Sequence, residues 1–392
     1  MSFFENLEKL PPDPIFGLVK AFSEDHRKTK VNLGVGQYQT AELKPFILNT
    51  VKKAEAHLLE EEYSKNYLPI DGEPSFIDLT KKLVFGEEED LSRIYGAQTV
   101  GGTAALNVGG HILYHQGIRK IYTSSPTWVN HNQIFSYIGF EIFHYPYWDE
   151  KQRTLDFTGF LDAIQEMPPK SALVLQGCCH NPTGVDPTLN QWEEIIALLK
   201  KRQVFPIVDF AYQGFGDGVD KDAAAISLFL KNGIEFFVTA SYSKNFGLYA
   251  ERTGALFCVT QGEEIAECVG DLTKMIIRRT YSNPPCHGGR IVVKILSDAV
   301  LRKKWEKELG MMRERIIEMR KSLVTELIAR QTTDFSYIAN QKGMFSFTGL
   351  DSSQVEQLIN DYGIYLPKNG RINVAGLNTS NLPFIAEAIC SV

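Results

Sequence analysis

Lys244 is the residue of this chain whose setting best suits covalent chemistry. It follows an apolar run that is typical of a strand, and open α/β sheets bind ligands where their strands end. Ser241 and Arg252 flank it, a hydroxyl donor and a fixed cation that suit a phosphate. An amine beside a phosphate site indicates a phosphorylated aldehyde held as a Schiff base, although a lone lysine is more often a solvated side chain.

Polar residues close two further apolar runs. Asp209 closes one of them, and a carboxylate there could keep a pyridinium N–H charged, which lets the ring withdraw electrons from a carbanion. Tyr212 could donate to the phenolate oxygen of the same ring. Asn181, which precedes Pro182, could offer its amide to that oxygen as well. The competing interpretations are a helix N-cap for Asp209 and a plain turn for Asn181.

A pair of glycines, Gly101 and Gly102, precedes an expected helix and is followed by Thr103. Small residues let the backbone N–H groups at a helix N-terminus approach a phosphate, although the same residues also form a common turn. The Gly-Val-Gly segment at 34–36 lacks the third glycine of a dinucleotide fingerprint, and no Walker A motif occurs. A nicotinamide-dependent dehydrogenase is therefore disfavoured.

The composition of the 392 residues, 44% hydrophobic and 22% charged, indicates a large folded protein. The formal net charge is −6 and no basic block occurs, so neither nucleic acid nor an anionic membrane is an expected partner. No stretch reaches the roughly 18 apolar residues of a membrane-spanning helix, and the N-terminus lacks the pattern of a signal peptide. We expect a soluble, cytoplasmic protein.

The six cysteines are too few for a disulfide scaffold in a chain of this length, and they fit a reducing cytosol. Cys178, Cys179 and His180 are adjacent, which raises the possibility of a metal site. Neighbouring side chains on an extended segment point to opposite faces. We therefore interpret the two cysteines as buried thiols and expect no metal.

The elements that must position these residues alternate between strands and helices. Helices are expected at 190–202 and 223–232. Strands are expected at 119–125, 141–147, 172–178, 204–210, 236–242 and 254–259. Strands separated by helices of this length need crossover connections, so the pattern predicts a doubly wound, mostly parallel α/β sheet.

The C-terminal part has a different pattern and predicts a smaller α+β unit. A long charged helix is expected at 302–330, and two short strands, at 343–347 and 371–374, lie around a helix at 353–362. The first 45 residues are interpreted as an arm that returns to pack on this unit. The expected division is 1–45 for the arm and part of the small domain, 46–305 for the large domain and 306–392 for the small C-terminal domain.

Taken together, these motifs resemble the class I (fold-type I) pyridoxal-phosphate-dependent aminotransferases, and among them the aspartate and aromatic aminotransferase subgroup. The resemblance runs essentially from end to end. The segment from Ser241 to Tyr249, Ser-Tyr-Ser-Lys-Asn-Phe-Gly-Leu-Tyr, is its most specific part. Further matching segments are Asn66 to Ile70, Ser125 to His131, Cys178 to Thr188, Ser282 to Pro285 and Gly370 to Asn373.

The resemblance implies pyridoxal 5'-phosphate as the cofactor, bound through Lys244, which would also move the proton between the substrate α-carbon and the cofactor. Asp209 would pair with the pyridine nitrogen, and Trp128 would stack on the ring. Tyr212 and Asn181 would contact the ring oxygen. The phosphate would be held by Gly102, Thr103, Ser241 and Arg252, joined by Tyr67 from the other subunit of a homodimer with shared active sites.

The resemblance also implies two carboxylate sites. Arg371 would grip the substrate α-carboxylate as a bidentate fork. The residues near it would be Trp128, Asn181 and the backbone of Gly36. Arg278 would reach across the dimer to a side-chain carboxylate, and its neighbour Arg279 competes for that role because only spacing separates the two.

Four positions depart from the family pattern. Gln176 stands where a histidine is common beneath the cofactor, and Gln39 replaces a basic residue. Ala104 stands for a glycine at the phosphate-binding helix, and Asn107 for an arginine one turn later. None of the four touches the proton-transfer groups, so they bear on substrate preference and cofactor electronics.

The implied activity is transfer of an amino group between small amino acids and 2-oxo acids in a ping-pong cycle, most simply between aspartate and 2-oxoglutarate. The alternative is an aromatic or broad-specificity enzyme, in which Ile15, Phe16 and Trp128 would line an apolar slot. A remote alternative is a non-catalytic regulatory module that binds the cofactor, but no basic helix-turn-helix stretch precedes the enzyme-like part.

Overall fold

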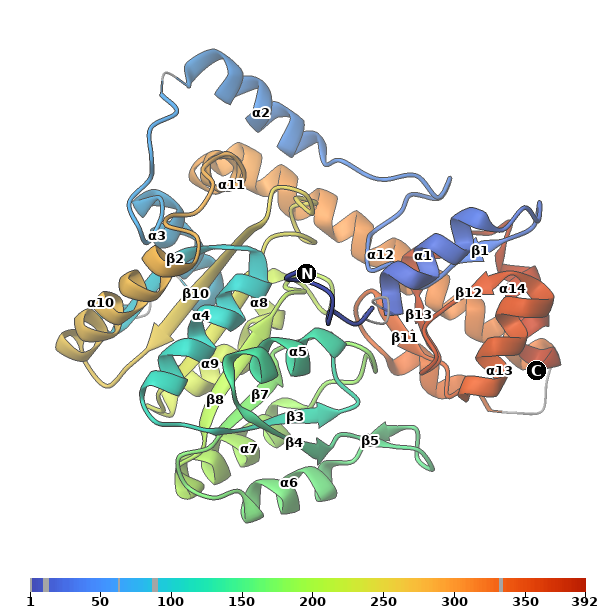
Figure 1. Ribbon diagram of the computed structural model, residues 1–392. Coiled ribbons are helices and arrows are strands. Elements are labelled where there is room, and N and C mark those ends of the chain that lie inside the picture. Colours follow the sequence, from blue (N-terminus) through green and yellow to red (C-terminus); the bar gives the residue numbers. More distant parts are fainter. Residues whose placement is uncertain (1, 10–13, 63, 87–90, 331–333) are drawn as a thin grey trace.

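The computed structural model describes residues 2–9, 14–62, 64–86, 91–330 and 334–392. Its centre is a seven-stranded sheet (Figure 1). The strands lie in the order β2 (Ile94–Val100), β10 (Thr253–Val259), β9 (Phe236–Ser241), β8 (Phe205–Phe210), β7 (Ala172–Gln176), β3 (Lys120–Ser125) and β4 (Glu141–Pro146). Among them β10 runs antiparallel to both neighbours and the other pairs are parallel. The predicted doubly wound, mostly parallel α/β fold is confirmed.

Helices cover both faces of the sheet. Along β7, Ala172 and Val174 pack into one core cluster, whereas Leu173 and Leu175 pack into the other. This alternation is required of a strand that is buried on both sides. The helices of this part are α2 (Asn49–Glu61), α3 (Pro74–Phe85), α4 (Gly101–His115), α5 (Val129–Ile138), α6 (Phe157–Glu166), α7 (Leu189–Arg202), α8 (Val219–Asp222), α9 (Ala224–Lys231), α10 (Glu263–Thr280) and α11 (His287–Ser297).

Strand β2 and the reversed direction of β10 were not predicted from the sequence. Gly96, Gln98 and Thr99 interrupt the apolar pattern of β2, yet Gln98 and Thr99 are buried. The backbone N–H of Gln98 donates to Asp71 O at 2.8 Å, so the turn before α3 covers this edge of the sheet. The direction of β10 could not be predicted because side chains alternate between the two faces in the same way in parallel and antiparallel strands.

The C-terminal unit is built on α12 (Ala299–Arg330), a helix of 32 residues. Its other elements are α1 (Pro14–Glu24), β1 (Val31–Asn32), β11 (Phe345–Phe347), α13 (Ser352–Gln357), which continues as a π-helix to Tyr362, β12 (Ile364–Tyr365), β13 (Arg371–Asn373) and α14 (Leu382–Ser391). A short hairpin of β5 (Trp148–Asp149) and β6 (Thr154–Leu155) lies outside it. No helix in the described ranges is long and apolar enough to cross a membrane.

The N-terminal segment returns to this unit, as Figure 1 shows by the blue ribbon beside the red one. Strand β1 pairs in parallel with β12, with Val31 opposite Ile364. Residues 10–13 of the arm lie outside the described residues. The domain boundaries at 45 and 305 stay predictions, and α12 runs through the second of them without a break.

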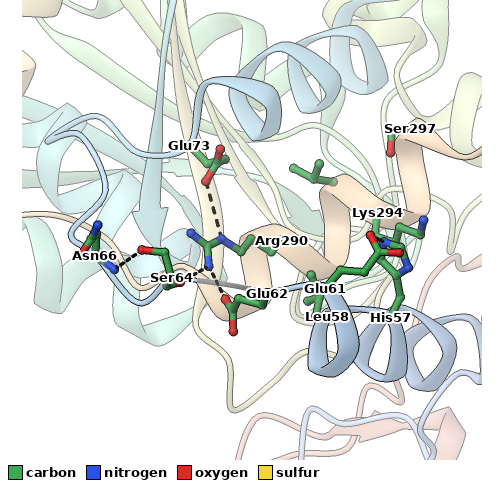
Figure 2. Close-up of a pocket in the computed structure, with 11 residues that line it drawn as sticks. His57, Leu58, Glu61, Glu62, Ser64, Asn66, Glu73, Arg290, Lys294 and Ser297 are labelled. Carbon is green, nitrogen blue, oxygen red and sulfur yellow. Dashed lines mark hydrogen bonds and ion pairs between the residues drawn. The ribbon is translucent and has the colours of Figure 1, made fainter.

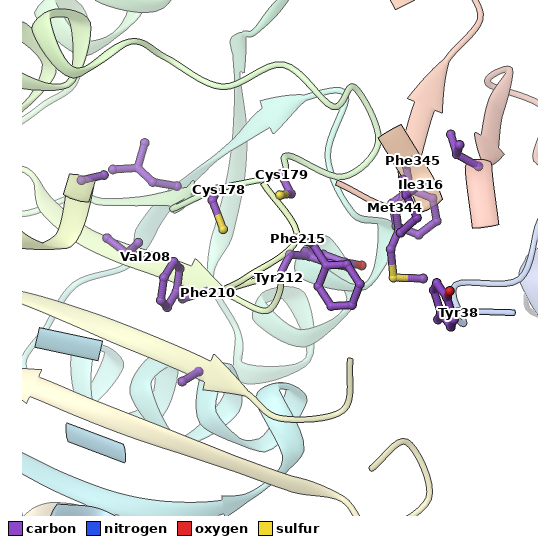
Figure 3. Packing of buried hydrophobic residues seen from close by; sticks show 14 of the residues in the cluster. Tyr38, Cys178, Cys179, Val208, Phe210, Tyr212, Phe215, Ile316, Met344 and Phe345 are labelled. Carbon is purple, nitrogen blue, oxygen red and sulfur yellow. The ribbon is translucent and has the colours of Figure 1, made fainter. Parts of the chain in front are cut away.

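A buried arginine fixes β11 at the junction of the two parts. Arg320 of α12 donates from Nε to Ser346 Oγ at 3.0 Å and from Nη2 to the carbonyls of Phe345 and Gly343. Burial lowers the pKa of Arg320 to about 10. Phe345 therefore lies in a fixed place, edge-on to Tyr212 with ring centroids 5.9 Å apart (Figure 3).

The two adjacent cysteines do not point to opposite faces, so the geometric reason given for the absence of a metal is wrong. Cys179 has a φ of 54°, which turns the chain, and both sulfur atoms lie within 4.8 Å of each other and of an Asp222 oxygen. Asp222 accepts the backbone N–H groups of Gly214, Gly216 and Asp217 at 2.7 to 2.9 Å. Its carboxylate therefore fastens the turn after Tyr212, and the absence of a metal stays a prediction.

Candidate active site

A cavity lies where β7, β8 and β9 end and α4 begins. Parallel strands present the loops after their carboxyl ends at one edge of a sheet, which is why residues far apart in sequence meet there. The cavity is lined by Gly102, Thr103, Leu106, Trp128, Gln176, Asn181, Asp209, Ala211, Tyr212, Ser241, Ser243, Lys244 and Arg252. All the residues predicted within one chain for the cofactor line this cavity.

Lys244 contributes an amine whose pKa is lowered. Burial lowers its pKa to about 8, Asp209 opposes this shift, and the nearby charge of Arg252 adds to it. The Nζ atom lies 4.8 Å from the centroid of the Tyr212 ring. A lysine with this pKa is partly neutral near pH 7 and is therefore a competent nucleophile.

The carboxylate of Asp209 is oriented by a histidine that the sequence analysis did not assign. His131, fully buried on α5, contacts Asp209 Oδ2 through Nε2 at 2.9 Å and Thr127 Oγ1 through Nδ1 at 2.8 Å. Its ring also lies edge-on to Trp128, with centroids 5.2 Å apart. The signal available in the sequence was a polar residue one turn after Trp128 on an otherwise buried helix face.

A second group of residues that line the cavity suits a phosphate group. Helix α4 begins at Gly101, and a Cβ on this glycine would lie 2.6 Å from Arg252 Nη2. A Cβ on Gly102 would lie 3.2 Å from Ser241. The glycines thus bring helix-terminal N–H groups, a hydroxyl and a guanidinium close together. A cavity that combines a cation, hydroxyls, an amine and a carboxylate fits a phosphorylated pyridine aldehyde.

Arg371 lies in an adjoining cavity that shares Trp128 and Asn181 with the first one. Its Nη1 donates to Asn181 Oδ1 at 3.1 Å and its Nη2 to Gly34 O at 2.6 Å. The Phe345 ring lies under the guanidinium at 4.2 Å, a contact that the sequence analysis missed.

The Nε donor of this guanidinium indicates a ligand. Arg371 Nε is buried and has no hydrogen-bond partner among the described residues. Burial lowers the pKa of Arg371 to about 10, so the group stays cationic at neutral pH. A buried cation with an open donor fits a carboxylate. The backbone of Gly36 is close by, since a Cβ there would lie 3.4 Å from Phe345.

Three predicted residues lie away from both cavities of the single chain. Tyr67 is 94% exposed, and Arg278 and Arg279 are exposed at the end of α10. Arg278 Nη1 donates to Ser282 Oγ at 2.5 Å. Neither arginine contacts the cofactor cavity, so the choice between them stays open.

Among the four departures from the family pattern, Gln176 lines the cofactor cavity. Gln39, Ala104 and Asn107 line neither cavity in the described structure. The side chains of Ile15 and Phe16, predicted to line an apolar slot, lie outside those described.

A third cavity lies beside the segment that carries Tyr67 (Figure 2). Arg290 of α11 forms an ion pair with Glu62, contacts Ser64 O at 3.2 Å and approaches Glu73 at 3.8 Å. The guanidinium therefore holds both ends of this surface segment. In this cavity Arg290 anchors the segment, and we assign no reactive group to it.

Comparisons with known proteins agree along the whole chain. The family model described as Aminotransferase class I and II matches residues 28–389. The aspartate aminotransferases of Haemophilus influenzae and Escherichia coli K12 are each 43% identical, over 99% of this chain and 100% of theirs. A crystal structure of an aromatic-amino-acid aminotransferase from Burkholderia pseudomallei, covalently bound to pyridoxal phosphate, has a TM-score of 0.97 and 44% identity, covering 100% of this chain and 99% of that one. The Saccharomyces cerevisiae cytoplasmic aspartate aminotransferase has a TM-score of 0.96 and 38% identity, over 99% and 98% of the chains.

Proposed function

Because this chain belongs to the aminotransferase class I and II family, we propose that it transfers the amino group between aspartate and 2-oxoglutarate with pyridoxal phosphate bound through Lys244. One observation carries the proposal: Lys244 lines one cavity together with Asp209 and Arg252, whose charges both act on its pKa, and this cavity adjoins the one that holds the open donor of Arg371. The predictions of family and of an aminotransferase activity are confirmed.

The cofactor, when bound, supplies an aldehyde that carries the amino group and a ring that withdraws electrons from the substrate α-carbon. Lys244 takes the proton from that carbon and returns it, because its amine is half neutral near pH 8. Asp209, held by His131, places negative charge at the ring nitrogen. Burial raises the pKa of Tyr212, so its hydroxyl stays protonated and donates to the ring oxygen.

Substrate binding is assigned to the two arginine sites. Arg371 holds the α-carboxylate through Nε and the adjacent Nη atom, and Phe345 and Gly34 fix the plane of its guanidinium. Arg278 of a second subunit binds the side-chain carboxylate, and Tyr67 of that subunit joins the phosphate site. This part of the proposal requires a homodimer with shared active sites. A cytoplasmic location remains a prediction from the sequence.

A second candidate function is that of an aromatic or broad-specificity aminotransferase. It is favoured by the likeness to structures such as the Burkholderia pseudomallei enzyme, whose name states an aromatic specificity. Both candidates use the same cavity and the same Arg371, and they differ only at the side-chain end of the substrate.

The test is a set of half-reactions with the purified holoenzyme and a panel of amino acids, followed by the loss of the aldehyde-form absorbance. We expect aspartate and glutamate to react, with phenylalanine and tyrosine as the informative comparison. An enzyme that converts only aromatic amino acids supports the second candidate. Absence of conversion with every amino acid would overturn both.

A further inference from the structure

Gln176 ends strand β7, directly beside Asp209 in the register of the sheet, and the residue is 7% exposed. It lines the cofactor cavity. No role follows for it from the proton transfer described above. Its hydrogen bonds show what it does contact.

Both polar atoms of the Gln176 amide bind the backbone of a single residue. Asn181 N–H donates to Gln176 Oε1 at 2.8 Å, and Gln176 Nε2 donates to Asn181 O at 3.0 Å. These two bonds close a ring across the turn between β7 and Asn181. Since both atoms point to Asn181, the side chain acts on that residue and leaves the cavity to other donors.

Asn181 lines both cavities, as Trp128 also does. Its Oδ1 accepts a hydrogen bond from Arg371 Nη1 at 3.1 Å, which leaves its Nδ2 atom as the donor available to a ligand in the cofactor cavity. The position of the Asn181 backbone thus sets the direction of Nδ2 and, together with Gly34 and Phe345, the orientation of Arg371.

We propose that Gln176 is a positioning residue that couples the cofactor cavity to the carboxylate site, by fixing Asn181 and through it the guanidinium of Arg371. The inference rests on the proposed function, since it assigns Arg371 to the α-carboxylate. It predicts that loss of the Gln176 amide weakens every ligand held by Arg371, whatever the other end of that ligand is.

The test measures ligand binding by calorimetry, without turnover, in holoenzyme saturated with pyridoxal phosphate. Succinate has two carboxylates, and 3-phenylpropionate has one. We expect Gln176→Met to weaken both by about tenfold, the effect of one misdirected hydrogen bond to a charged group. Arg278→Ala should weaken the binding of succinate alone, so the two variants differ in whether the affinity for 3-phenylpropionate also falls.

Gln354→Met is the matched control. Gln354 also accepts one backbone N–H, from Asp351, and donates to one backbone carbonyl, that of Val392, but it does so in the C-terminal unit at α13. It should lower the melting temperature without changing either affinity. If Gln176→Met also lowers the melting temperature and leaves both affinities unchanged, Gln176 has only a structural role and the inference is overturned.

A double-mutant cycle tests the route through Asn181. Asn181→Ala keeps the backbone that Gln176 binds and removes the contact with Arg371, so Gln176→Met should cost little further affinity in that background. Full additivity would contradict the coupling. If Gln176→Met does not fold, Gln176→Asn replaces it, because the shorter amide cannot span the same two bonds.

The outcomes separate this inference from the proposed function. A wild-type enzyme that binds 3-phenylpropionate but not succinate contradicts the dicarboxylate substrate, and the Gln176 comparison then runs on 3-phenylpropionate alone. Unchanged affinities in Gln176→Met and Gln176→Asn, with succinate still bound by the wild type, overturn only the inference.

Discussion

The cofactor cavity and the surface that carries Tyr67 and Arg278 differ in how complete they are within one chain. In the cavity, Asp209 and Asn181 are buried and held by further side chains, His131 and Gln176. Tyr67 and Arg278 are exposed, and neither lines the cavity. The difference indicates that one chain builds the reacting centre, whereas any role of Tyr67 and Arg278 requires a second chain.

The surface segments are nevertheless firmly fixed. Gln98, buried in β2, accepts the backbone N–H of Glu73 at 3.0 Å and donates to Pro285 O at 2.9 Å. It therefore joins the segment after Tyr67 to the segment after Arg278. Arg290 adds its ion pair with Glu62. Side chains that are exposed on a well-anchored backbone suit contact with a second copy of the chain.

The largest expected effect lies in the cavity. Lys244→Ala removes both the covalent attachment and the positioned base, and we expect turnover to fall by at least about a thousandfold. Borohydride reduction and peptide mapping should find the cofactor on Lys244 of the wild type. Lys81→Ala is the matched control, because burial also lowers the pKa of Lys81, whose Nζ binds Ile94 O outside the cavity. Near-native turnover in Lys244→Ala would overturn the proposed mechanism.

The cavity was also the part that the sequence predicted best. Asp209 lies at the end of β8, and Lys244 and Asn181 follow β9 and β7 of the same mostly parallel sheet, so their meeting at one edge follows from topology alone. The motif resemblance added Arg371 and Trp128, whose position depends on how the C-terminal unit packs. That packing was not predictable from local pattern.

The features that the sequence did not predict depend on contacts that only the folded chain makes. His131 and Phe345 have ordinary positions in a helix and a strand, and only the fold places them against Asp209 and Arg371. The geometry of Cys178 and Cys179 was predicted wrongly because Cys179 has a positive φ, which alternation along a strand does not foresee. Tyr67 and Arg278 stay predictions until the assembly is measured.

A smaller effect is expected at the surface, where it depends on the substrate. Arg278→Ala should lower kcat/KM for aspartate by at least about a hundredfold and leave phenylalanine within about tenfold, as expected when one desolvated ion pair is removed. Arg279→Ala is the control and should change neither value appreciably. Equal losses for the two substrates would make Arg278 structural, and a selective loss in Arg279→Ala would transfer the role to that residue.

The lowered pKa of Lys244 predicts that the reactivity of its amine in the cavity depends on pH. A pKa lowered to about 8 means that the reactive neutral amine is fully present above that pH and is lost as the pH falls through it. In cofactor-free protein, the rate of covalent attachment of pyridoxal phosphate should therefore rise about tenfold per pH unit below pH 8 and level off above it.

Asp209→Asn should move that plateau to lower pH. The Asp209 carboxylate raises the pKa of Lys244 and so opposes the effect of burial, which means that this pKa falls further when the charge is removed. A plateau reached only near pH 10 in the wild type would show that burial does not act on Lys244 as inferred.

The comparison between cavity and surface is tested most directly by mixing two damaged chains. In a dimer of one Lys244→Ala chain and one Arg278→Ala chain, shared sites leave one site with an intact Lys244 and an intact partner Arg278. Random pairing makes about half of the dimers mixed, so about a quarter of the wild-type aspartate activity should return. If each chain used its own Arg278, no site would hold both residues and no activity would return. Mass measurement of the mixed dimers is the control, because absent activity in verified mixed dimers contradicts sharing, whereas absent dimers contradict the homodimer itself.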